Sequence, residues 1–397
     1  DHACLTAKPR AMLPTADFSA HNEEQAAVWQ AYQGRAPIRV PMRLGVSSRY
    51  TVFNSEANPA GHTFEAFFSD PRVMFEQLLA KQHFIRHRLW CDQEMGLPEK
   101  WTVAVDFQNS HEALWYGCPI HFRDGEVPDT TPLLNDDNKR MLFDLGLPEP
   151  FPETGWAARA WEYYDLFRRW AAEGYEFHGR PVEVARSVPG LASDGIFTTA
   201  VALRNPTGLM LDIFTDPDYV HKLLDFITEA TIRRIRAYRE RLDHPVESTA
   251  CGLADDAIQM LSPQHYREFV LPYHRRYMDE FGPQGPNSCH LCGDATRHFV
   301  TIRDELRVGS FDTGFPVDFS QLRADLGPDV EVSGGVHVEL LRAGPPEAIR
   351  AEVRRILSSG ICEGGRFVLR DANNLAPHTP PEHIEVMYQA CREYGQY

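Results

Sequence analysis

His290 and Cys292 are the residues of this sequence best suited to metal chemistry, because only one leucine separates them. They stand in the segment GPNSCHLCG, which has the character of a short strand followed by a turn, so both side chains can reach one ion beyond the strand end. Zinc accepts nitrogen and sulfur ligands, and a catalytic zinc site keeps one position open. A third ligand would have to come from another strand. The alternative interpretation is a histidine bonded to the backbone beside a buried cysteine.

Acidic residues form the second set of candidates for chemistry. Asp255 and Asp256 follow the predicted strand VESTACG (246–252), where they could transfer a proton, bind a cation or orient a ligand. Two solvated carboxylates in a turn are the alternative. Asp106 and His337 are further catalytic candidates, since each directly follows an apolar strand segment.

Other polar residues at predicted strand ends could bind a metal or a substrate. Further candidate metal ligands are Asp371 and Cys251. Candidate substrate-binding residues are Arg43, Arg49, Tyr50, Asn109, His111, Asp312, Asn373 and Asn374. Many such residues in any barrel only cap helices or bind the backbone, and a helix cap at Asn109 would explain the segment after Asp106 without catalysis. Substrate specificity is expected in the aromatic-rich loops 43–63, 106–155 and 187–210.

A regular alternation of strands and helices positions these residues. Strand candidates lie near residues 38, 102, 182, 247, 286, 308, 330 and 367, and helical segments separate them. Repeated βα units form a parallel sheet, and eight of them close into a barrel with its active site at the carboxyl ends of the strands. The sequence therefore predicts an α/β fold, a (β/α)8 TIM barrel. A doubly wound open sheet would carry a glycine-rich phosphate loop after its first strand, and MRLGVSSRY (42–50) is not one.

We expect a single domain over residues 1–397. Residues 1–37 are predicted to form an N-terminal helical extension packed on the barrel. Residues 118–160 are rich in proline, aspartate and glycine, which predicts an excursion over the surface rather than a second domain.

The composition limits the kinds of partner. With 40 basic and 56 acidic residues the formal net charge is −16, which argues against nucleic acid or anionic membrane as a binding partner. The sequence has no apolar run of about 18 residues and its first residues lack the apolar core of a signal peptide. We therefore expect a cytoplasmic protein that acts on a small molecule and whose eight cysteines are thiols.

Five motifs occur in a characteristic order along the second half of the chain. They are SPQHYREFVLPYHRRY, CHLCGD, FDTGFPVDFSQLRADLG, VEVSGGVHVELLRAGPPEAIRAEVRRIL and FVLRDANNLAPHTPPEHIEVMYQACREYG. In this order they resemble the uroporphyrinogen decarboxylase superfamily, which includes the decarboxylase and the corrinoid and coenzyme M methyltransferases. The resemblance is strongest over residues 180–397 and weaker at 64–135. It is specific for the superfamily rather than for one activity, and it implies a TIM barrel and a homodimer.

The methyltransferases of this superfamily have a zinc site made by a His-x-Cys pair and a distant cysteine. The resemblance therefore implies a methyl or alkyl transferase with zinc at His290 and Cys292. The distant cysteine does not match, because Asn373 stands in its place. Either zinc is absent or another residue completes the site: Asp255, Asp256, Asp371 or Cys251. Corrinoid-linked transfer would also require a partner protein that carries the cobalamin, because no cobalamin-binding motif is visible in this chain.

The decarboxylase branch implies a second function, a metal-independent lyase that acts on an aromatic or pyrrolic carboxylic acid. Asp106 or Asp255 would then handle the proton, and Arg43 and Arg49 would hold carboxylates. The segment MRLGVSSRY is only distantly similar to the N-terminal arginine loop of the true decarboxylase, which argues against a role in haem synthesis. A third interpretation is a barrel that has lost catalysis and binds a small ligand.

Overall fold

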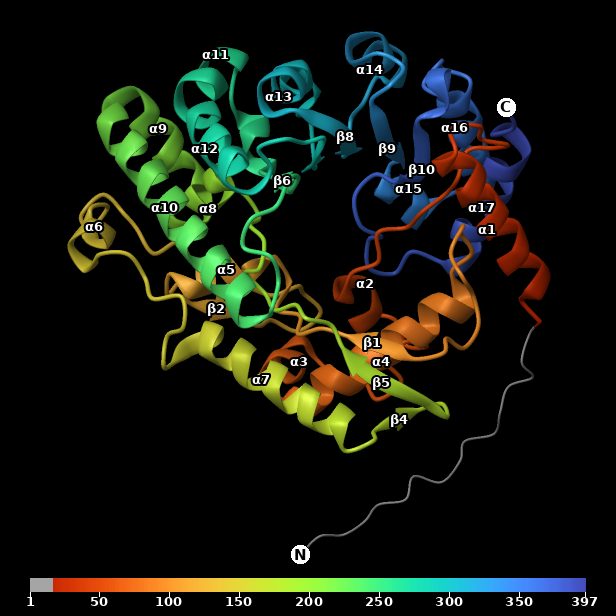
Figure 1. Cartoon of the computed structure of the whole chain (residues 1–397), viewed down its shortest axis with the longest axis horizontal. Coiled ribbons are helices and arrows are strands. Elements are labelled where there is room, and N and C mark those ends of the chain that lie inside the picture. Colours follow the sequence, from red (N-terminus) through yellow and green to blue (C-terminus); the bar gives the residue numbers. More distant parts are fainter. Residues whose placement is uncertain (1–16) are drawn as a thin grey trace, which may run out of the picture.

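The computed structural model describes residues 17–397, so the first 16 residues of the expected N-terminal extension lie outside the described part of the chain. It is an α/β structure whose long strands run parallel and are covered by helices (Figure 1). The strands are β1 (Trp101–Val103), β2 (Ile120–His121), β3 (Asp129–Thr130), β4 (Glu176–Phe177), β5 (Arg180–Val184), β6 (Gly252–Ala254), β7 (Asn287–Leu291), β8 (Val308–Thr313), β9 (Glu331–Val336) and β10 (Phe367–Asp371).

Seventeen α-helices surround these strands within residues 17–397. They are α1 (Ser19–Gln33), α2 (Ser48–Val52), α3 (Phe64–Ser69), α4 (Pro71–Arg88), α5 (His111–Trp115), α6 (Met141–Leu145), α7 (Gly155–Ala172), α8 (Ile196–Arg204), α9 (Pro206–Thr215), α10 (Pro217–Arg241), α11 (Pro263–His265), α12 (Leu271–Phe281), α13 (Phe299–Leu306), α14 (Phe319–Leu326), α15 (Val338–Ala343), α16 (Pro346–Leu357) and α17 (Pro381–Tyr394).

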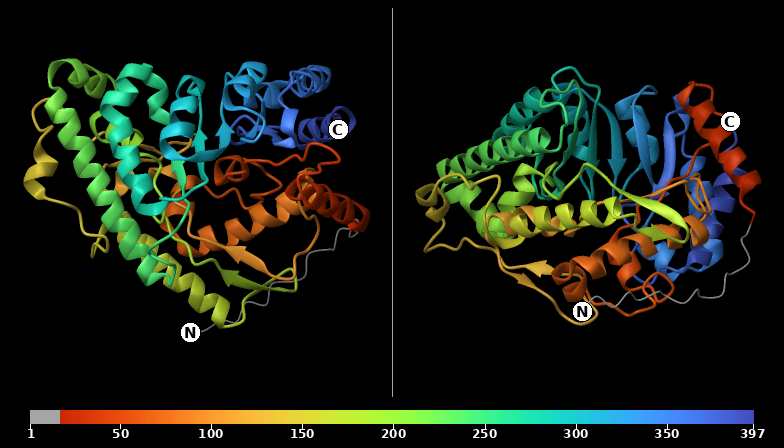
Figure 2. Two further views of the ribbon diagram at one scale, coloured as in Figure 1. Left: turned by 45° about the horizontal axis from the view of Figure 1, so that its top comes forward. Right: turned by 60° about the horizontal axis from the view of Figure 1, so that its bottom comes forward.

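The parallel strands follow one another in the order of a (β/α)8 barrel. A five-stranded sheet runs β10-β9-β8-β7-β6, and its strands lie side by side in Figure 2. Next to β10, the extended segment 40–43 pairs in parallel through Met42 and Leu369. β1 pairs in parallel with β5 in a second sheet. Seven of the eight strand positions expected from the sequence are thus strands, and the first is an extended segment held to β10.

Two elements differ from their expected boundaries, each for a local reason. β6 begins only at Gly252, because the carbonyl of Thr249 accepts the N–H groups of Gln284 and Gly285 from the loop before β7. The helical segment expected between the strands near 247 and 286 is divided by a π-helical turn, η3 (Tyr266–Val270). Pro272 has no N–H to continue the α-helical bonding, and the N–H of Leu271 instead bonds the carbonyl of Tyr266.

The segment 118–160 contains the β2–β3 hairpin and the short helix α6 before it enters α7. Helix α1 contacts the rest of the chain through the indole N–H of Trp29, which donates to the carbonyl of Asp92 at 2.6 Å. The carboxyl end of the chain lies on the first extended segment, where Arg39 and Gln396 form a bridge. Within residues 17–397 no helix combines the length and the apolar character that a membrane crossing requires.

Candidate active site and metal centre

Three potential ligands converge where β6 and β7 end. His290 is the fourth residue of β7, Cys292 follows its last residue, and Asp256 begins the 3-10 turn η2 (Asp256–Met260) beyond β6. The two strands are neighbours, with Ala254 opposite His290. One ligand atom from each of the three side chains lies within 4.8 Å of the other two. Parallel strands bring their carboxyl ends to one edge, and here that edge carries a nitrogen, a sulfur and an oxygen donor.

The imidazole of His290 is oriented by a chain of polar side chains across three strands. Its Nδ1 lies 2.7 Å from Asp312 Oδ2 on β8. Arg370 on β10 donates its Nη1 to the same carboxylate oxygen at 2.5 Å. The hydrogen bond from His290 to Asp312 raises the pKa of His290. This arrangement leaves Nε2 facing Cys292 Sγ, 3.2 Å away. A carboxylate that holds the far nitrogen of a histidine is the usual support of a metal-ligating imidazole.

The donor set fits a zinc ion. Nitrogen and sulfur ligands of one tetrahedral zinc lie roughly 3.6 Å apart, close to the separation of His290 Nε2 and Cys292 Sγ. The backbone N–H of Cys292 donates to Asp256 Oδ1 at 2.6 Å, which fixes the carboxylate beside the other two donors. Burial raises the pKa of the Cys292 thiol, so the thiol favours its protonated form until a cation compensates. Three protein ligands would leave a fourth position open.

Asp255, the neighbour of Asp256, points the other way and has a different role. Its carboxylate is fully buried and accepts hydrogen bonds from the N–H groups of Phe197 and Thr198, at 2.8 and 2.7 Å. The hydroxyl of Thr198 and Nε2 of His274 approach the same carboxylate at 2.8 Å each. Asp255 therefore joins the end of β6 to the start of α8 and to α12. Four partners occupy its oxygens, so it serves to position Asp256.

Comparison with known proteins shows the family. The family model for uroporphyrinogen decarboxylase (URO-D) matches residues 182–394. A methylated-thiol–coenzyme M methyltransferase of Methanosarcina mazei is 30% identical over 297 residues, which are 74% of this chain and 72% of the relative. The chain belongs to the uroporphyrinogen decarboxylase family. The resemblance expected from the motifs is confirmed.

Relatives of both branches of the uroporphyrinogen decarboxylase family are similar to this chain. A uroporphyrinogen decarboxylase of an Azoarcus species is 26% identical over 70% of this chain and 74% of its own length. The solved structure of a methyltransferase from Methanosarcina mazei superposes with a TM-score of 0.62 at 18% identity, over 93% of this chain and 98% of that one. The expected TIM-barrel fold is thus confirmed.

The segment in which the methyltransferases of the family carry their distant cysteine follows β10 in this chain. Arg370 donates to the backbone carbonyl of Asn373 at 2.6 Å, and Asn374 donates to the side-chain oxygen of Asn373 at 3.3 Å. Asp371 is fully buried, and its Oδ1 accepts the N–H of Gly45 at 2.8 Å. Burial raises the pKa of Asp371 to about 7. Asp371 ties the end of β10 to the first loop and is not in the three-ligand group.

The other rim of the barrel mouth carries the candidates from the first two βα loops. Asp106 accepts the hydroxyl of Ser48 at 2.6 Å and the backbone and side-chain N–H groups of Gln108 at 2.8 and 2.7 Å. Arg49 donates to the side-chain oxygen of Asn109, and its Nε is buried without a partner among residues 17–397. The structure thus brings Arg49 and Asn109 into contact, and their role in binding a substrate stays a prediction.

Two further titratable residues, Asp194 and Lys81, lie at this rim. The carboxyl of Asp194, in the loop between β5 and α8, accepts no hydrogen bond from residues 17–397, and burial together with Glu112 raises its pKa to about 7. Lys81 on α4 reaches Ser48 Oγ at 3.4 Å, and burial lowers its pKa. A single lysine inside a helical segment carries no periodic signal, so only the fold reveals Lys81.

Two sequence interpretations, those of Tyr50 and Cys251, are corrected by burial or position. Tyr50 is fully buried and donates to the carbonyl of Thr379 at 2.8 Å, so it has no surface for a substrate. Cys251 precedes β6 and lies with its sulfur 3.3 Å from Met278 Sδ, at the opposite end of the strands from Cys292. His337 follows β9 and caps α15, where its Nδ1 accepts the N–H of Glu339 at 3.2 Å, and its catalytic role stays a prediction. The sequence had placed the strand before Cys251 too early, which put Cys251 at the wrong end.

Two further substrate candidates, Asp312 and Arg43, contact other residues of the chain. Asp312 holds His290 and Arg370, as described above. The guanidinium of Arg43 lies over the ring of Trp29 of α1 at 4.1 Å, away from the mouth. The interpretation of Arg43 as a residue of the mouth is therefore wrong, because its side chain extends toward the amino ends of β9 and β10.

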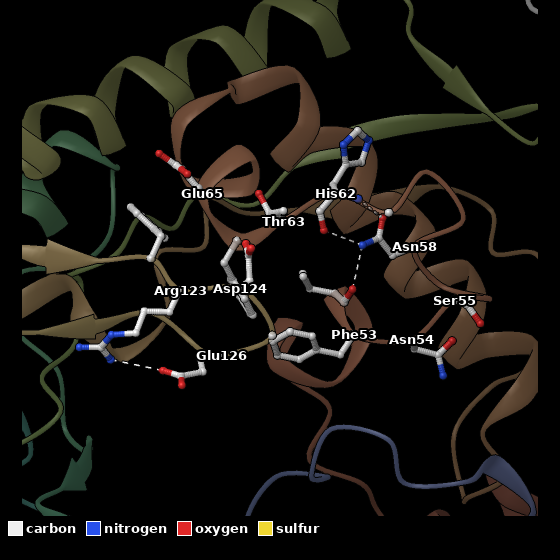
Figure 3. A pocket seen from close by; sticks show the side chains of 15 residues that line it. Phe53, Asn54, Ser55, Asn58, His62, Thr63, Glu65, Arg123, Asp124 and Glu126 are labelled. Atoms are coloured by element: carbon white, nitrogen blue, oxygen red, sulfur yellow. Dashed lines mark hydrogen bonds and ion pairs between the residues drawn. The ribbon is translucent and has the colours of Figure 1, made fainter.

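A hollow of about 370 Å³ opens beside the mouth, between residues 52–65 and the hairpin residues 122–126 (Figure 3). Its lining combines aromatic rings such as Phe53 with an Arg123–Glu126 ion pair at 3.3 Å. Phe53 also lies 6.0 Å from the ring of His378 in the segment after β10. The hollow thus borders the loops in which specificity was expected.

His111 is buried, and neither of its ring nitrogens has a partner among residues 17–397. Burial and Arg234 lower its pKa to about 3. The folded state therefore takes up this proton at lower pH than the unfolded state, whose pKa is near 6.5. The stability associated with His111 is fully present above pH 6.5 and is lost as pH falls toward 3.

We therefore expect His111→Phe to lose less stability in acid than the original protein. Between pH 6 and 4 the difference in unfolding free energy should grow by up to about 1.4 kcal/mol per pH unit. Urea unfolding at several pH values measures it. Parallel curves for the two proteins would show that the unfolded and folded states protonate His111 alike.

Proposed function

We propose that this chain is a zinc-dependent methyl or alkyl transferase whose ligands are Asp256, His290 and Cys292. The observation that carries the proposal is the convergence of these three donors within 4.8 Å. The coenzyme M methyltransferase among its relatives supports the reaction class. Asp256 would take the place of the distant cysteine, for which Asn373 stands in this sequence.

The residues of this chain would each have a definite task. Asp312 and Arg370 hold the imidazole of His290, and the N–H of Cys292 holds Asp256. When bound, the metal would keep an acceptor thiol in its thiolate form. The thiolate sulfur would form a bond to the transferred carbon, and the leaving group would depart with the electron pair of the bond that breaks. Arg49 and Asn109, on the opposite rim, would orient the acidic part of the acceptor.

The methyl donor in this proposal is a corrinoid carried by a partner protein, with the acceptor a small thiol. The experiment is a metal analysis combined with a transfer assay from methylcobalamin to coenzyme M. We expect about one equivalent of zinc per chain and a transfer rate that falls on chelation and returns when zinc is added. A protein that binds no zinc after incubation with the metal would contradict the proposal.

A metal-independent carboxy-lyase is the second candidate, and the state of Asp194 favours it. A carboxyl with a pKa of about 7 at the mouth, near Arg49, could deliver a proton to a carbon that loses carbon dioxide. The uroporphyrinogen decarboxylases among the relatives support this class. The assay measures release of carbon dioxide from an aromatic or pyrrolic acid by protein from which a chelator has removed metal. Activity under this condition that is lost in Asp194→Asn would favour the lyase. Absence of both reactions with zinc bound would favour a barrel that only binds a ligand.

A further inference from the structure

A second cavity lies at the other end of the strands from the three-ligand group. It has a volume of about 340 Å³ and is lined by Trp29, Tyr32, Gln33, Arg35, Arg43, Glu331, Arg366 and Val368. Glu331 is the first residue of β9, and Arg366 directly precedes β10, so the cavity opens at the amino ends of these strands. Trp29, Tyr32 and Gln33 of helix α1, together with Arg35 just after it, form part of the cavity lining. No residue is shared with the metal centre.

Arg43 brings a positive charge into this cavity without an acidic partner. Its guanidinium lies over the ring of Trp29 at 4.1 Å. Among residues 17–397 no hydrogen bond or ion pair reaches that guanidinium. An arginine stacked on an aromatic face is held flat while its N–H groups point outward in the plane of the guanidinium. Arg43 is exposed, and the contact with Trp29 orients its guanidinium while its donors stay available.

Arg366 adds a second guanidinium that is only partly satisfied. It lies over the ring of Tyr32 at 5.1 Å and forms an ion pair with Glu331 at 3.0 Å. Its Nε is buried and has no partner among residues 17–397. A buried donor without an acceptor is unfavourable, so the charge of Arg366 is only partly compensated at the cavity wall.

Arg35 is the third arginine of the cavity and has a strained backbone. Its φ of 61° lies in the left-handed region, which is unfavourable for a residue with a Cβ. Its only acidic neighbour, Asp329, is 4.0 Å away, and both side chains are exposed, so the pair is weak. The lining thus contains three arginines against one carboxylate, Glu331. Glu331 is itself occupied by Tyr32, Arg366 and the hydroxyl of Ser310.

We propose that this cavity is a binding site for a small anion with phosphate or carboxylate oxygens. Guanidinium groups pair with such oxygens through two parallel hydrogen bonds, and the cavity has the volume of a small-molecule site. The excess of positive charge is local, since the whole chain has a net charge of −16. The site is independent of the metal centre and of the reaction proposed there.

Calorimetric titration of the whole protein with inorganic phosphate, and separately with succinate, tests the proposal at low ionic strength. We expect at least one of the two anions to bind with a Kd in the millimolar range or below. Arg43→Gln should weaken that binding by roughly tenfold or more. Glu331→Gln, which removes the one negative charge of the lining, should strengthen it. The anion that binds more tightly identifies phosphate or carboxylate as the ligand class.

Arg72→Gln is the matched control, because Arg72 also stacks on a tryptophan, at 5.1 Å from Trp170, but lies outside the cavity and pairs with Glu76. It should leave anion binding unchanged. The proposal is overturned if neither anion binds, or if binding persists unchanged in Arg43→Gln, which would place the anion elsewhere, for example on a bound metal. If Arg43→Gln does not fold, Glu331→Gln alone tests the proposal. Anion binding that is unchanged or weaker in Glu331→Gln than in the original protein then overturns it.

Discussion

Cys292→Ser is expected to lower the affinity for zinc more than about 100-fold and to abolish zinc-dependent transfer. The sulfur of Cys292 lies 3.2 Å from His290 Nε2, where both atoms can bind one zinc ion. A serine hydroxyl stays protonated near neutral pH and is a poor zinc ligand. Serine is close to cysteine in volume, and Cys292 is only half-buried. The fold should therefore survive the substitution. Competition of the protein with a chromophoric chelator measures the affinity, and transfer from methylcobalamin to coenzyme M measures the activity.

Two further variants separate loss of a ligand from general damage. Cys251→Ser alters a thiol that packs against Met278 at the other end of the strands and should retain zinc. Asp312→Asn keeps all three ligands but weakens the hold on His290 Nδ1, and should lower zinc affinity about 10–100-fold. If Cys292→Ser binds zinc as tightly as the original protein, the three-ligand site is not the metal centre.

The sequence was enough to predict the barrel and two of the three candidate ligands, His290 and Cys292. Strand and helix alternation is local, and the His-x-Cys spacing at a strand end places two side chains together whatever the rest of the fold does. The third ligand depended on tertiary structure. Asp255 and Asp256 are adjacent acids of the same kind, and only the packing of α8 and α12 shows that Asp255 turns inward and Asp256 faces Cys292.

Asp256 also bears on what the substitution at Asn373 means. A carboxylate in place of a second thiolate keeps two anionic ligands beside a neutral imidazole, so the charge presented to a divalent ion is unchanged. Oxygen is a harder donor than sulfur, and it comes from the end of β6 instead of β10.

Glu112→Ala is expected to destabilise the fold by about 3–5 kcal/mol, although Glu112 is not a candidate metal ligand. Glu112 is buried and pairs with the fully buried guanidinium of Arg234 on α10, at 2.5 Å. Its other carboxylate oxygen accepts the N–H of Asp194 at 2.8 Å and the hydroxyl of Ser193 at 3.1 Å. Removing the carboxylate leaves the charge of Arg234 buried without a counter-ion and releases the loop that presents Asp194 to the mouth.

Chemical denaturation of Glu112→Ala and Glu149→Ala provides the comparison. Glu149 pairs with Arg233, the neighbour of Arg234 on the same helix, but at 3.2 Å and with both side chains largely exposed. Its removal should cost no more than about 1 kcal/mol. The double variant Glu112→Leu with Arg234→Met should recover much of the loss, because it removes both buried charges together. A loss that persists in the double variant would show that the loop contacts of Glu112, rather than its ion pair, determine the stability.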